Sequence, residues 1–339
     1  MQKMSISNSA TVLVTGATGA VGPRVVQALS AARYQIRTLS LDQPSKGQWP
    51  DDVETRIGDV TDPAAVQSAM QEVDAVIHLA ALLHIVNPPP ELREKYERIN
   101  VGGTATVVDA AVKAGVKRIV LASTIAVYGP SNGRILNEDS NPHPDTFYAQ
   151  TKLAAEKIVL NARRADNQPI GTVLRFGAVY GSRIKGNYER LVRALTRHCF
   201  IPVGAGQNRR TLVYDKDIAR AIVLAVQHPA AAGKIYNVTD GRFHELNEII
   251  TAISAALGRK PPRFSLPVGP VRVATGIVED SMRLIGRSSP IGRSAIDKYT
   301  EDIAVEGKRI QGELGFVPQY DLSAGWRETV REMREEGEL

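Results

Sequence analysis

The chain has almost no cysteine. Cys199 is the only one among 339 residues, so no disulfide can form within the chain and no thiolate metal cluster can be built. The six histidines show no metal-ligand spacing, and we therefore expect no metal site. A chain that cannot form its own disulfides is typical of a reducing compartment, and we expect a cytoplasmic protein.

Long apolar runs and dense basic tracts are also missing. No uninterrupted apolar stretch approaches the ~20 residues that a membrane-spanning helix needs, and residues 1–10 are polar, without the apolar region of a signal peptide. Lys and Arg number 42 against 36 Asp and Glu, and no basic tract is interleaved with aromatics. We therefore expect neither a membrane nor a nucleic acid as a partner.

Short apolar strands alternate with helical patterns through the first half of the chain. The expected strands are 11–14, 35–41, 55–57, 75–79, 117–123 and 172–175. The expected helices are 22–32, 63–71, 93–114 and 148–165. This alternation predicts an α/β fold, a Rossmann doubly wound parallel sheet whose strands end along one common edge.

After residue 180 the alternation loosens. Further helices are expected over 188–198, 216–227 and 245–257, and four prolines interrupt the stretch 261–270. We expect residues 1–180 to form an NAD(P)-binding Rossmann domain, with a return segment near 211–240. Residues 181–210 and 241–339 would form a smaller, interleaved substrate-binding domain.

A glycine-rich loop follows the first expected strand and opens the first expected helix. Gly16 permits a tight turn, Gly19 lets the backbone approach a pyrophosphate, and Gly22 lets helix and strand pack closely. The backbone N–H groups of this loop, which includes Ala20 and Val21, and the dipole of the helix would then hold the phosphates. The loop predicts a dinucleotide site.

Residues after the next two strands are candidates for binding the adenosine end of that dinucleotide. An acidic residue about 20 positions beyond the loop would bond the ribose hydroxyls and favour NAD. Ser40 lies near that place and Asp42 two residues beyond it, although Asp42 is equally a solvated turn residue. Asp59, followed by Val60, would bond the adenine amino group or is a turn acid. We expect NAD and leave NADP open.

Tyr148 and Lys152 stand four residues apart in an expected helix, so both side chains share one face. A free tyrosine, with a pKa of about 10, is a poor base at neutral pH. A nearby ammonium and a positive nicotinamide ring would stabilise the phenolate and lower that pKa. Tyr148 would then accept a hydroxyl proton while hydride leaves the same carbon. The pair predicts hydride chemistry on an alcohol or carbonyl.

With these motifs in view, the chain resembles the extended short-chain dehydrogenase/reductases of the NAD-dependent epimerase/dehydratase (nucleotide-sugar) type. Besides the glycine loop, the matching segments are Gly58-Asp59-Val60, His78-Leu79-Ala80-Ala81, Asn100-Val101-Gly102-Gly103-Thr104, Ala122-Ser123-Thr124, Val127-Tyr128-Gly129, Tyr148 to Lys152 and Arg175 to Gly181. The resemblance implies a catalytic set of Thr124, Tyr148 and Lys152, with Ser123 as a competing hydroxyl. It also implies cofactor contacts from Leu79, Ala80, Ala81, Asn100 and Lys152.

In the second half of the chain, the resemblance to the family includes segments with which its members contact substrate. Arg210 corresponds to an arginine that grips a substrate pyrophosphate, or is a solvated basic turn. Asn187 would contact the nucleotide or cap a helix, and His84 would line the sugar pocket or be an ordinary loop residue. Ala178 stands where many nucleotide-sugar epimerases carry asparagine, so one amide contact is missing.

These observations leave three functions open. We favour an NAD-dependent 4-epimerase that acts on a nucleotide-linked hexose or hexosamine through a 4-keto intermediate; Lys185-Gly186-Asn187 resembles a branch found in surface-polysaccharide pathways. The alternative is an NAD(P)H-dependent 4-keto-sugar reductase or a hydroxysteroid-type dehydrogenase, and a minor one is a non-catalytic NAD(P)-binding regulatory protein. Ile125 and Ala126 follow Thr124, which leaves 4,6-dehydration without its acid–base pair. The family also implies a homodimer through a four-helix bundle of 93–114 and 148–165.

Overall fold

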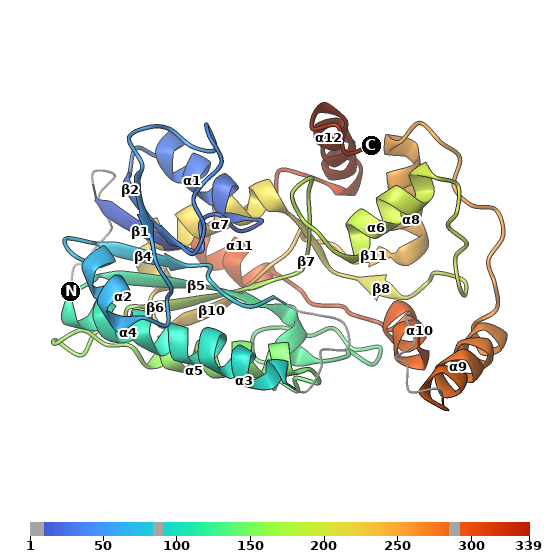
Figure 1. The fold of residues 1–339 in the computed structure, drawn as a ribbon, viewed down its shortest axis with the longest axis horizontal. Coiled ribbons are helices and arrows are strands. Elements are labelled where there is room, and N and C mark those ends of the chain that lie inside the picture. Colours follow the sequence, from blue (N-terminus) through green and yellow to red (C-terminus); the bar gives the residue numbers. More distant parts are fainter. Residues whose placement is uncertain (1–9, 84–90, 285–291) are drawn as a thin grey trace.

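Seven parallel strands form the central sheet of the protein (Figure 1), whose structure is a computed structural model that describes residues 10–83, 91–284 and 292–339. Their order is β10-β6-β5-β4-β1-β2-β3. The bounds are β1 Thr11–Thr15, β2 Gln35–Ser40, β3 Glu54–Ile57, β4 Ala75–His78, β5 Arg118–Thr124, β6 Gly171–Phe176 and β10 Lys234–Val238. The predicted doubly wound parallel sheet is confirmed, and β10 joins it from the expected return segment.

Helices cover both faces of the sheet (Figure 1). One face carries α1 (Gly22–Ala31), α7 (Asp215–Gln227) and α11 (Lys308–Leu314), and the other carries α2 (Pro63–Ala69), α4 (Gly103–Lys113) and α5 (Phe147–Asn161). On α1, Val25, Val26 and Leu29 recur at helical spacing and are fully buried. Each face of the sheet therefore packs on its own apolar cluster, which holds the strand ends rigidly in place.

Helix ends follow local capping chemistry. Asp62 accepts a hydrogen bond from the backbone of Ala64 and precedes Pro63 at the start of α2. Thr146 caps α5 in the same way, and this helix ends at Asn161, four residues before the predicted end. The expected helix 93–114 is divided into α3 (Leu92–Tyr96), a π-helical segment η1 (Glu97–Gly102) and α4.

The rest of the chain lies beyond the carboxyl ends of the sheet strands. β7 (Ala178–Tyr180) pairs with β9 (Leu212–Tyr214) in parallel, and β8 (Arg209–Arg210) pairs with β11 (His244–Glu245) in antiparallel fashion. Residues of α6 (Asn187–Thr196), α8 (Leu246–Ala256) and α12 (Leu322–Glu335) share a third core cluster with these strands. In contrast, α11 packs against β10, although the sequence analysis grouped it with the substrate-binding residues.

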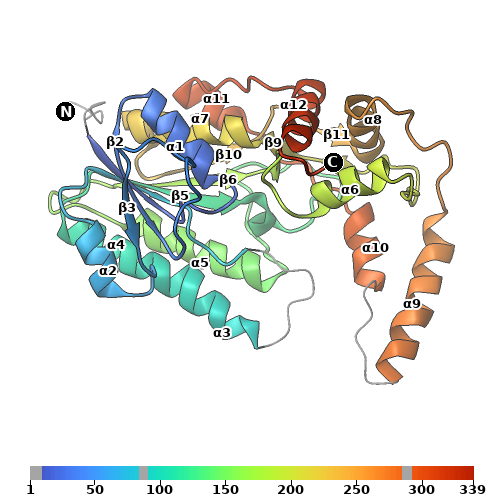
Figure 2. The same ribbon diagram turned by 45° about the horizontal axis from the view of Figure 1, so that its top comes forward.

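Two further helices, α9 (Val268–Leu284) and α10 (Arg293–Thr300), project away from this body, as Figures 1 and 2 both show. They pack against one another. Among the described residues, no helix combines the length and apolar character needed to cross a bilayer.

Candidate active site

The parallel strands bring the predicted site residues to one edge of the sheet. Thr15, the last residue of β1, lies opposite His78 on one side and Leu39 on the other. Thr124, the last residue of β5, lies opposite Phe176. The glycine loop, the loop after β4 and the end of β5 therefore meet along one line, where doubly wound sheets bind ligands.

The glycine loop has the geometry that its three glycines predict. Gly16 has a φ of +70°, and an added Cβ would come 2.7 Å from the backbone of Ala80. At Gly22 a Cβ would collide with the carbonyl of Ala17, so only glycine lets α1 start there. A Cβ at Gly19 would meet only the carbonyl oxygen of Gly16, 3.1 Å away, and beyond it the loop backbone is open.

The first turn of α1 is suited to an anion. Within the described residues, its N-cap residue Val21 makes no side-chain capping bond, and the first turn holds no acidic side chain. The N–H groups there, next to Ala20, keep the positive end of the helix dipole uncompensated. Together with the open backbone at Gly19, this cradle fits the pyrophosphate of a dinucleotide.

Ser40 supports this loop from the end of β2. Its side chain is buried, and its hydroxyl oxygen accepts a hydrogen bond of 3.3 Å from the backbone N–H of Thr18. Asp42 is exposed two residues further on. Of the two predicted ribose residues, Asp42 therefore has the side chain that a ribose could reach from solvent, whereas Ser40 is engaged with the loop.

Asp59 and Val60 follow β3. The Asp59 carboxylate accepts a hydrogen bond of 2.9 Å from the backbone of Thr61, and its other oxygen lies 3.8 Å from the Arg98 guanidinium. Val60 is buried and packs in the cluster beneath the sheet. Asp59 is thus held in a turn at the strand edge, with its carboxylate partly exposed.

The loop after β4 is clamped by Asn100. The side-chain oxygen of Asn100 accepts from the Leu82 N–H at 2.7 Å, and its amide donates to the Leu82 carbonyl and to Thr151 on α5. This bonding fixes the loop that contains Leu79, Ala80 and Ala81. Asn100 lies in the π-helical segment, which explains why the regular helix pattern gave no sign of this clamp. His84 lies outside the described residues.

A buried hydrogen-bonded chain lies under this loop. Burial, together with the charge of Lys152, lowers the pKa of His78 to about 3, so its ring is neutral. Thr104 donates to the Asn100 carbonyl, and its oxygen therefore accepts from His78 Nε2 at 3.1 Å. The other ring nitrogen then accepts from the Thr15 hydroxyl at 2.7 Å. His78 at the end of β4 thus connects the end of β1 to α4 and, through Thr104, to Asn100 in η1.

Tyr148 and Lys152 both lie on α5, one turn apart. The Tyr148 ring is partly buried and meets the Tyr96 ring edge-on, with 6.5 Å between centroids. Lys152 is only 4% exposed. The Glu156 carboxylate, one helical turn further on, acts on the charge of the Lys152 ammonium. An ammonium at this edge, with three N–H donors, fits the hydroxyl groups of a bound ribose.

The two pKa shifts differ from the simplest expectation. Burial raises the pKa of Tyr148 to about 12, with a smaller contribution from Tyr96. Burial also lowers the pKa of Lys152 to about 8, against the opposing effect of Glu156. The sequence analysis expected the ammonium to lower the phenol pKa, whereas in the protein alone burial and Tyr96 both raise the pKa of Tyr148.

Ser123 and Thr124 have separate environments. The Ser123 hydroxyl is buried and donates to the Glu156 carboxylate, which Arg175 binds in turn through Nε and Nη2, the latter at 2.6 Å. The Thr124 oxygen accepts from the backbone N–H of Ala126 at 3.1 Å and caps a short 3-10 turn, η2 (Ile125–Tyr128). The hydroxyl proton of Thr124 is left for another partner, so Thr124 is the better placed of the two to orient a reacting oxygen.

Glu156 and Arg175 are functional candidates that sequence reasoning missed. Both side chains are at most 3% exposed, and Glu156 is one helical turn beyond Lys152. A glutamate in an α-helix is ordinarily exposed to solvent, so the sequence did not indicate that Glu156 forms a buried ion pair. The i, i+4 spacing from Lys152 was the available signal.

The predicted substrate residues of the second half lie in β7, α6 and β8, outside the central sheet. Ala178 is partly buried in β7 and contributes only a methyl group. Asn187 is the first residue of α6, with Gly186 as its N-cap, and its side chain is exposed. Arg210 donates from Nη2 to the carbonyls of Lys298 and Tyr299 at 2.7 and 2.8 Å, which holds the last turn of α10.

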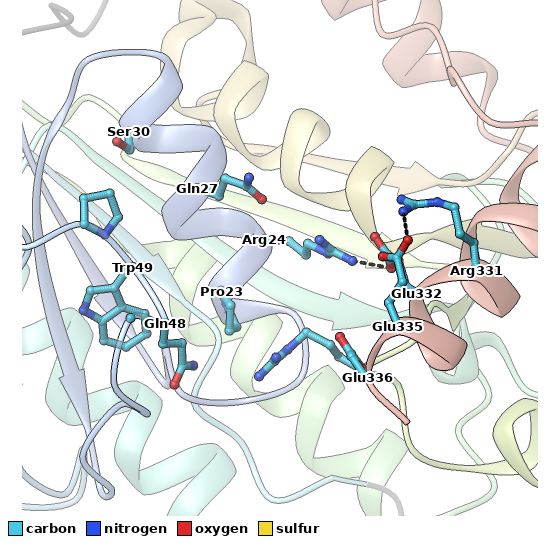
Figure 3. A pocket seen from close by; sticks show the side chains of 13 residues that line it. Pro23, Arg24, Gln27, Ser30, Gln48, Trp49, Arg331, Glu332, Glu335 and Glu336 are labelled. Carbon is cyan, nitrogen blue, oxygen red and sulfur yellow. Dashed lines mark hydrogen bonds and ion pairs between the residues drawn. The ribbon is translucent and has the colours of Figure 1, made fainter. Parts of the chain in front are cut away.

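A separate cavity of about 650 Å³ lies between α1, the loop 47–50 and α12, and Figure 3 shows it from close by. None of the predicted site residues lines it. Arg24 crosses it to Glu332 on α12 and to Asp215 on α7. This ion-pair cluster links the helix that follows the glycine loop to the C-terminal helix, and the cavity is distinct from the candidate active site.

Comparison with known proteins identifies relatives along nearly the whole chain. The sequence model of the NAD dependent epimerase/dehydratase family matches residues 12–239. An N-acetyl-α-D-glucosaminyl-diphospho-ditrans,octacis-undecaprenol 4-epimerase from Escherichia coli O157:H7 is 30% identical over 94% of each chain, and a UDP-glucose 4-epimerase from Vibrio cholerae is 27% identical over 94% of each. The solved structure of MoeE5 in complex with UDP-glucose and NAD has a TM-score of 0.76 and 26% identity, and covers 96% of this chain and 99% of its own.

Proposed function

Because this chain belongs to the NAD-dependent epimerase/dehydratase family, we propose that it is a 4-epimerase that uses NAD. Its substrate is a hexose or hexosamine joined through a diphosphate to a nucleoside or a polyprenol, as in two similar proteins. The observation that supports this most is the position of Tyr148 and the buried Lys152 one turn apart on α5, at the edge that carries the glycine loop.

The proposed mechanism assigns one role to each residue. Bound NAD would supply the acceptor, and later the donor, of the hydride. Tyr148 takes the proton of the C4 hydroxyl, Lys152 binds the ribose and stabilises the phenolate by its charge, and the Thr124 hydroxyl orients the reacting oxygen. The 4-keto sugar would then rotate within the site so that its other face is reduced, and Tyr148 would return the proton to the C4 oxygen.

Two features support epimerisation over dehydration. Ile125 and Ala126 follow Thr124 in η2, so no carboxylate is present at the positions from which dehydratases remove water. Ala178, on the other hand, offers no amide to a sugar or phosphate. This favours as second candidate a 4-keto-sugar reductase or hydroxysteroid-type dehydrogenase, in which NAD(P)H is consumed or released rather than recycled.

The cofactor residues also belong to this proposal. The residues that would hold the pyrophosphate are Gly19, Ala20 and Val21, and those that would bind the adenosine end are Asp42 and Asp59. Leu79, Ala80 and Ala81, whose loop Asn100 fixes, would contact the nicotinamide end. Arg210 and Asn187 contact the diphosphate and its carrier. No arginine side chain is present at Leu41, directly after β2, which is consistent with NAD rather than NADP.

We further propose a homodimer in which the helix run α3–α4 and helix α5 of each copy form a four-helix bundle. These helices lie together on one face of the sheet (Figure 1). Light scattering of the purified protein tests this directly, and a monomeric mass would exclude it.

The function is tested with purified protein, no added cofactor, and a panel of UDP-glucose, UDP-N-acetylglucosamine and a polyprenyl-diphosphate sugar, followed by NMR. Interconversion of C4 epimers by the wild type is expected, and the Tyr148→Phe variant should retain NAD but lose turnover. Turnover only when stoichiometric NAD(P)+ is added, with a 4-keto product and NAD(P)H formed in equal amounts, would favour the dehydrogenase or reductase instead.

A further inference from the structure

An apolar patch lies where the segment that follows α6 runs beside the segment that precedes α9. Its side chains are Ile201, Phe264 and Leu266, which are 59%, 85% and 45% exposed. Two backbone hydrogen bonds of 2.8 Å flank a parallel bridge between Val203 and Leu266 and hold the two segments together. Ile201 and Phe264 each precede this bridge by two residues, and side chains two residues apart in an extended segment share a face. The three exposed side chains therefore gather at one place.

The backbone under the patch is held in position. Phe200, next to Ile201, packs against the third core cluster. Gly204 has a φ of +77°, and an added Cβ there would come 2.9 Å from the side chain of Val268 at the start of α9. The exposure of Ile201 thus belongs to an anchored segment. Neighbouring exposed apolar side chains on an anchored backbone are typical of a surface that binds a ligand or partner.

The patch adjoins Arg210 through Tyr299. The Tyr299 carbonyl accepts a hydrogen bond of 2.8 Å from Arg210 Nη2, and the Tyr299 ring packs against the third core cluster. Burial raises the pKa of the Tyr299 phenol, whereas the backbone of Val203 and the charge of Arg210 oppose that rise, so both lie near the phenol oxygen. Because Val203 is bridged to Leu266, one tyrosine side chain connects the guanidinium to the patch.

Arg210 keeps hydrogen-bond donors for an anion. Both of its hydrogen bonds to the last turn of α10 leave from Nη2. Its Nε and Nη1 make no hydrogen bond or ion pair with the described residues and are open to solvent. A diphosphate oxygen accepts charge-assisted hydrogen bonds from such a guanidinium. One elongated ligand can therefore place an anionic group on Arg210 and an apolar group on the patch.

We propose that the substrate is a polyprenyl-diphosphate sugar, whose diphosphate binds Arg210 and whose first isoprene units lie on Ile201, Phe264 and Leu266. This rests on the proposed 4-epimerase function, in which the carrier is a nucleoside or a polyprenol, and it selects the polyprenol. The base and ribose of a nucleoside carry polar atoms that need hydrogen-bonding partners when they leave water. The three side chains of the patch offer none, whereas burying them under a hydrocarbon chain is favourable.

Binding of carrier analogues tests the proposal without turnover. Inorganic diphosphate, UDP and farnesyl diphosphate, the last below its micelle-forming concentration, are titrated into the protein with NAD present, and calorimetry gives the affinities. Farnesyl diphosphate should bind at least about tenfold more tightly than either of the others. Ile201→Ser and Phe264→Ser should each weaken farnesyl diphosphate about tenfold, because one apolar contact is lost, and leave inorganic diphosphate unchanged. Arg210→Gln should weaken both ligands.

Val317→Ser is the matched control, because Val317 is 66% exposed and lies between α11 and α12, outside the patch. It should bind every ligand like the wild type, and all variants should keep the wild-type circular dichroism. Tighter binding of UDP than of farnesyl diphosphate, or equal farnesyl diphosphate affinities of the patch and control variants, would overturn the proposal. So would an oligomer, formed without ligand, that Phe264→Ser dissociates, since the patch is then a subunit contact.

The turnover assay separates this proposal from the 4-epimerase assignment. Epimerisation of UDP sugars without any of the polyprenyl-diphosphate sugar would contradict the polyprenol carrier and leave the 4-epimerase in place. Farnesyl diphosphate binding that depends on Ile201 and Phe264, in a protein that epimerises no sugar, would contradict only the 4-epimerase.

Discussion

Replacing Glu156 with glutamine should damage the enzyme in two separable ways. Glu156 and Arg175 form a bidentate ion pair in which both side chains are at most 3% exposed, and Ser123 donates a third hydrogen bond to the same carboxylate. Removing one partner of a buried pair costs about 3–5 kcal/mol. Glutamine keeps the side-chain volume and one hydrogen-bond acceptor, so we expect the free energy of unfolding to fall by about 3 kcal/mol.

The second effect is on Lys152. Its pKa is about 8 because burial lowers it while the Glu156 carboxylate opposes that shift. A unit charge roughly 6 Å away contributes about 3 kcal/mol at an effective dielectric of about 20, or about two pKa units. Since Arg175 neutralises part of that charge, we expect Glu156→Gln to lower the Lys152 pKa by about one unit. The alkaline limb of activity, where the ammonium is lost, should move to lower pH by the same amount.

The assays are denaturant unfolding and the pH profile of kcat/KM. Glu335→Gln is the control, because it makes the same substitution in an exposed pair with Arg331 and should leave both measurements unchanged. If Glu156→Gln unfolds at the wild-type denaturant concentration, the pair is not a buried support. If the alkaline limb stays in place, Glu156 does not act on Lys152 and the positioning argument fails.

Three further predictions follow from the same geometry. Gly16→Ala should abolish NAD binding, because its Cβ would collide with the backbone after β4. Gly47→Ala is the control: Gly47 has a similar φ of +73° but lies in open space, so the variant should lose only about 1–2 kcal/mol to strain and bind NAD normally. Equal NAD affinity of the two variants in calorimetry would refute the proposed phosphate-binding loop. NAD affinity should fall above about pH 8, as Lys152 loses the proton that its burial has made labile, and an affinity that stays flat across that range by fluorescence titration would contradict this role. Hydrogen bonds from Arg209 hold the pKa of Asp302 at about 2, below its unfolded value, so Asp302 should contribute stability above about pH 4 that is lost as the pH falls towards 2; Asp302→Asn should flatten this acid dependence, and an unchanged acid unfolding curve would contradict it.

The central sheet could be predicted from the sequence because its strands are short apolar runs. The loop of Gly16, Gly19 and Gly22 could be predicted from the spacing of its glycines after the first strand. The glycine at position 22 is required by a backbone contact with Ala17, five residues away, and such a local constraint is visible in a sequence, whereas Gly16 meets the backbone of Ala80 from another strand end. The π-helical segment around Asn100 was not predicted, since its altered hydrogen bonding leaves no compositional mark. The burial of Glu156 was also missed, because it depends on Arg175 from a strand far along the chain.

Helices α9 and α10 are a second case in which long-range packing could not be predicted from the sequence. The four prolines of 261–270 predicted an interruption, and α9 begins at Val268 within that stretch. Whether its apolar residues would face a core or solvent is set by what packs against them. Among the described elements α10 packs against α9 at Gly276, and these two helices lie on either side of residues 285–291 in the chain.

The most direct test of the central claim is the fate of the hydrogen on C4. A substrate deuterated at C4, incubated with purified protein in ordinary water and without added cofactor, should give a C4 epimer that retains its deuterium, because hydride leaves and returns within one bound complex. Mass spectrometry and NMR of the product read this directly. Replacement of the deuterium by solvent hydrogen, or a 4-keto product that accumulates without its epimer, would contradict the proposed 4-epimerase.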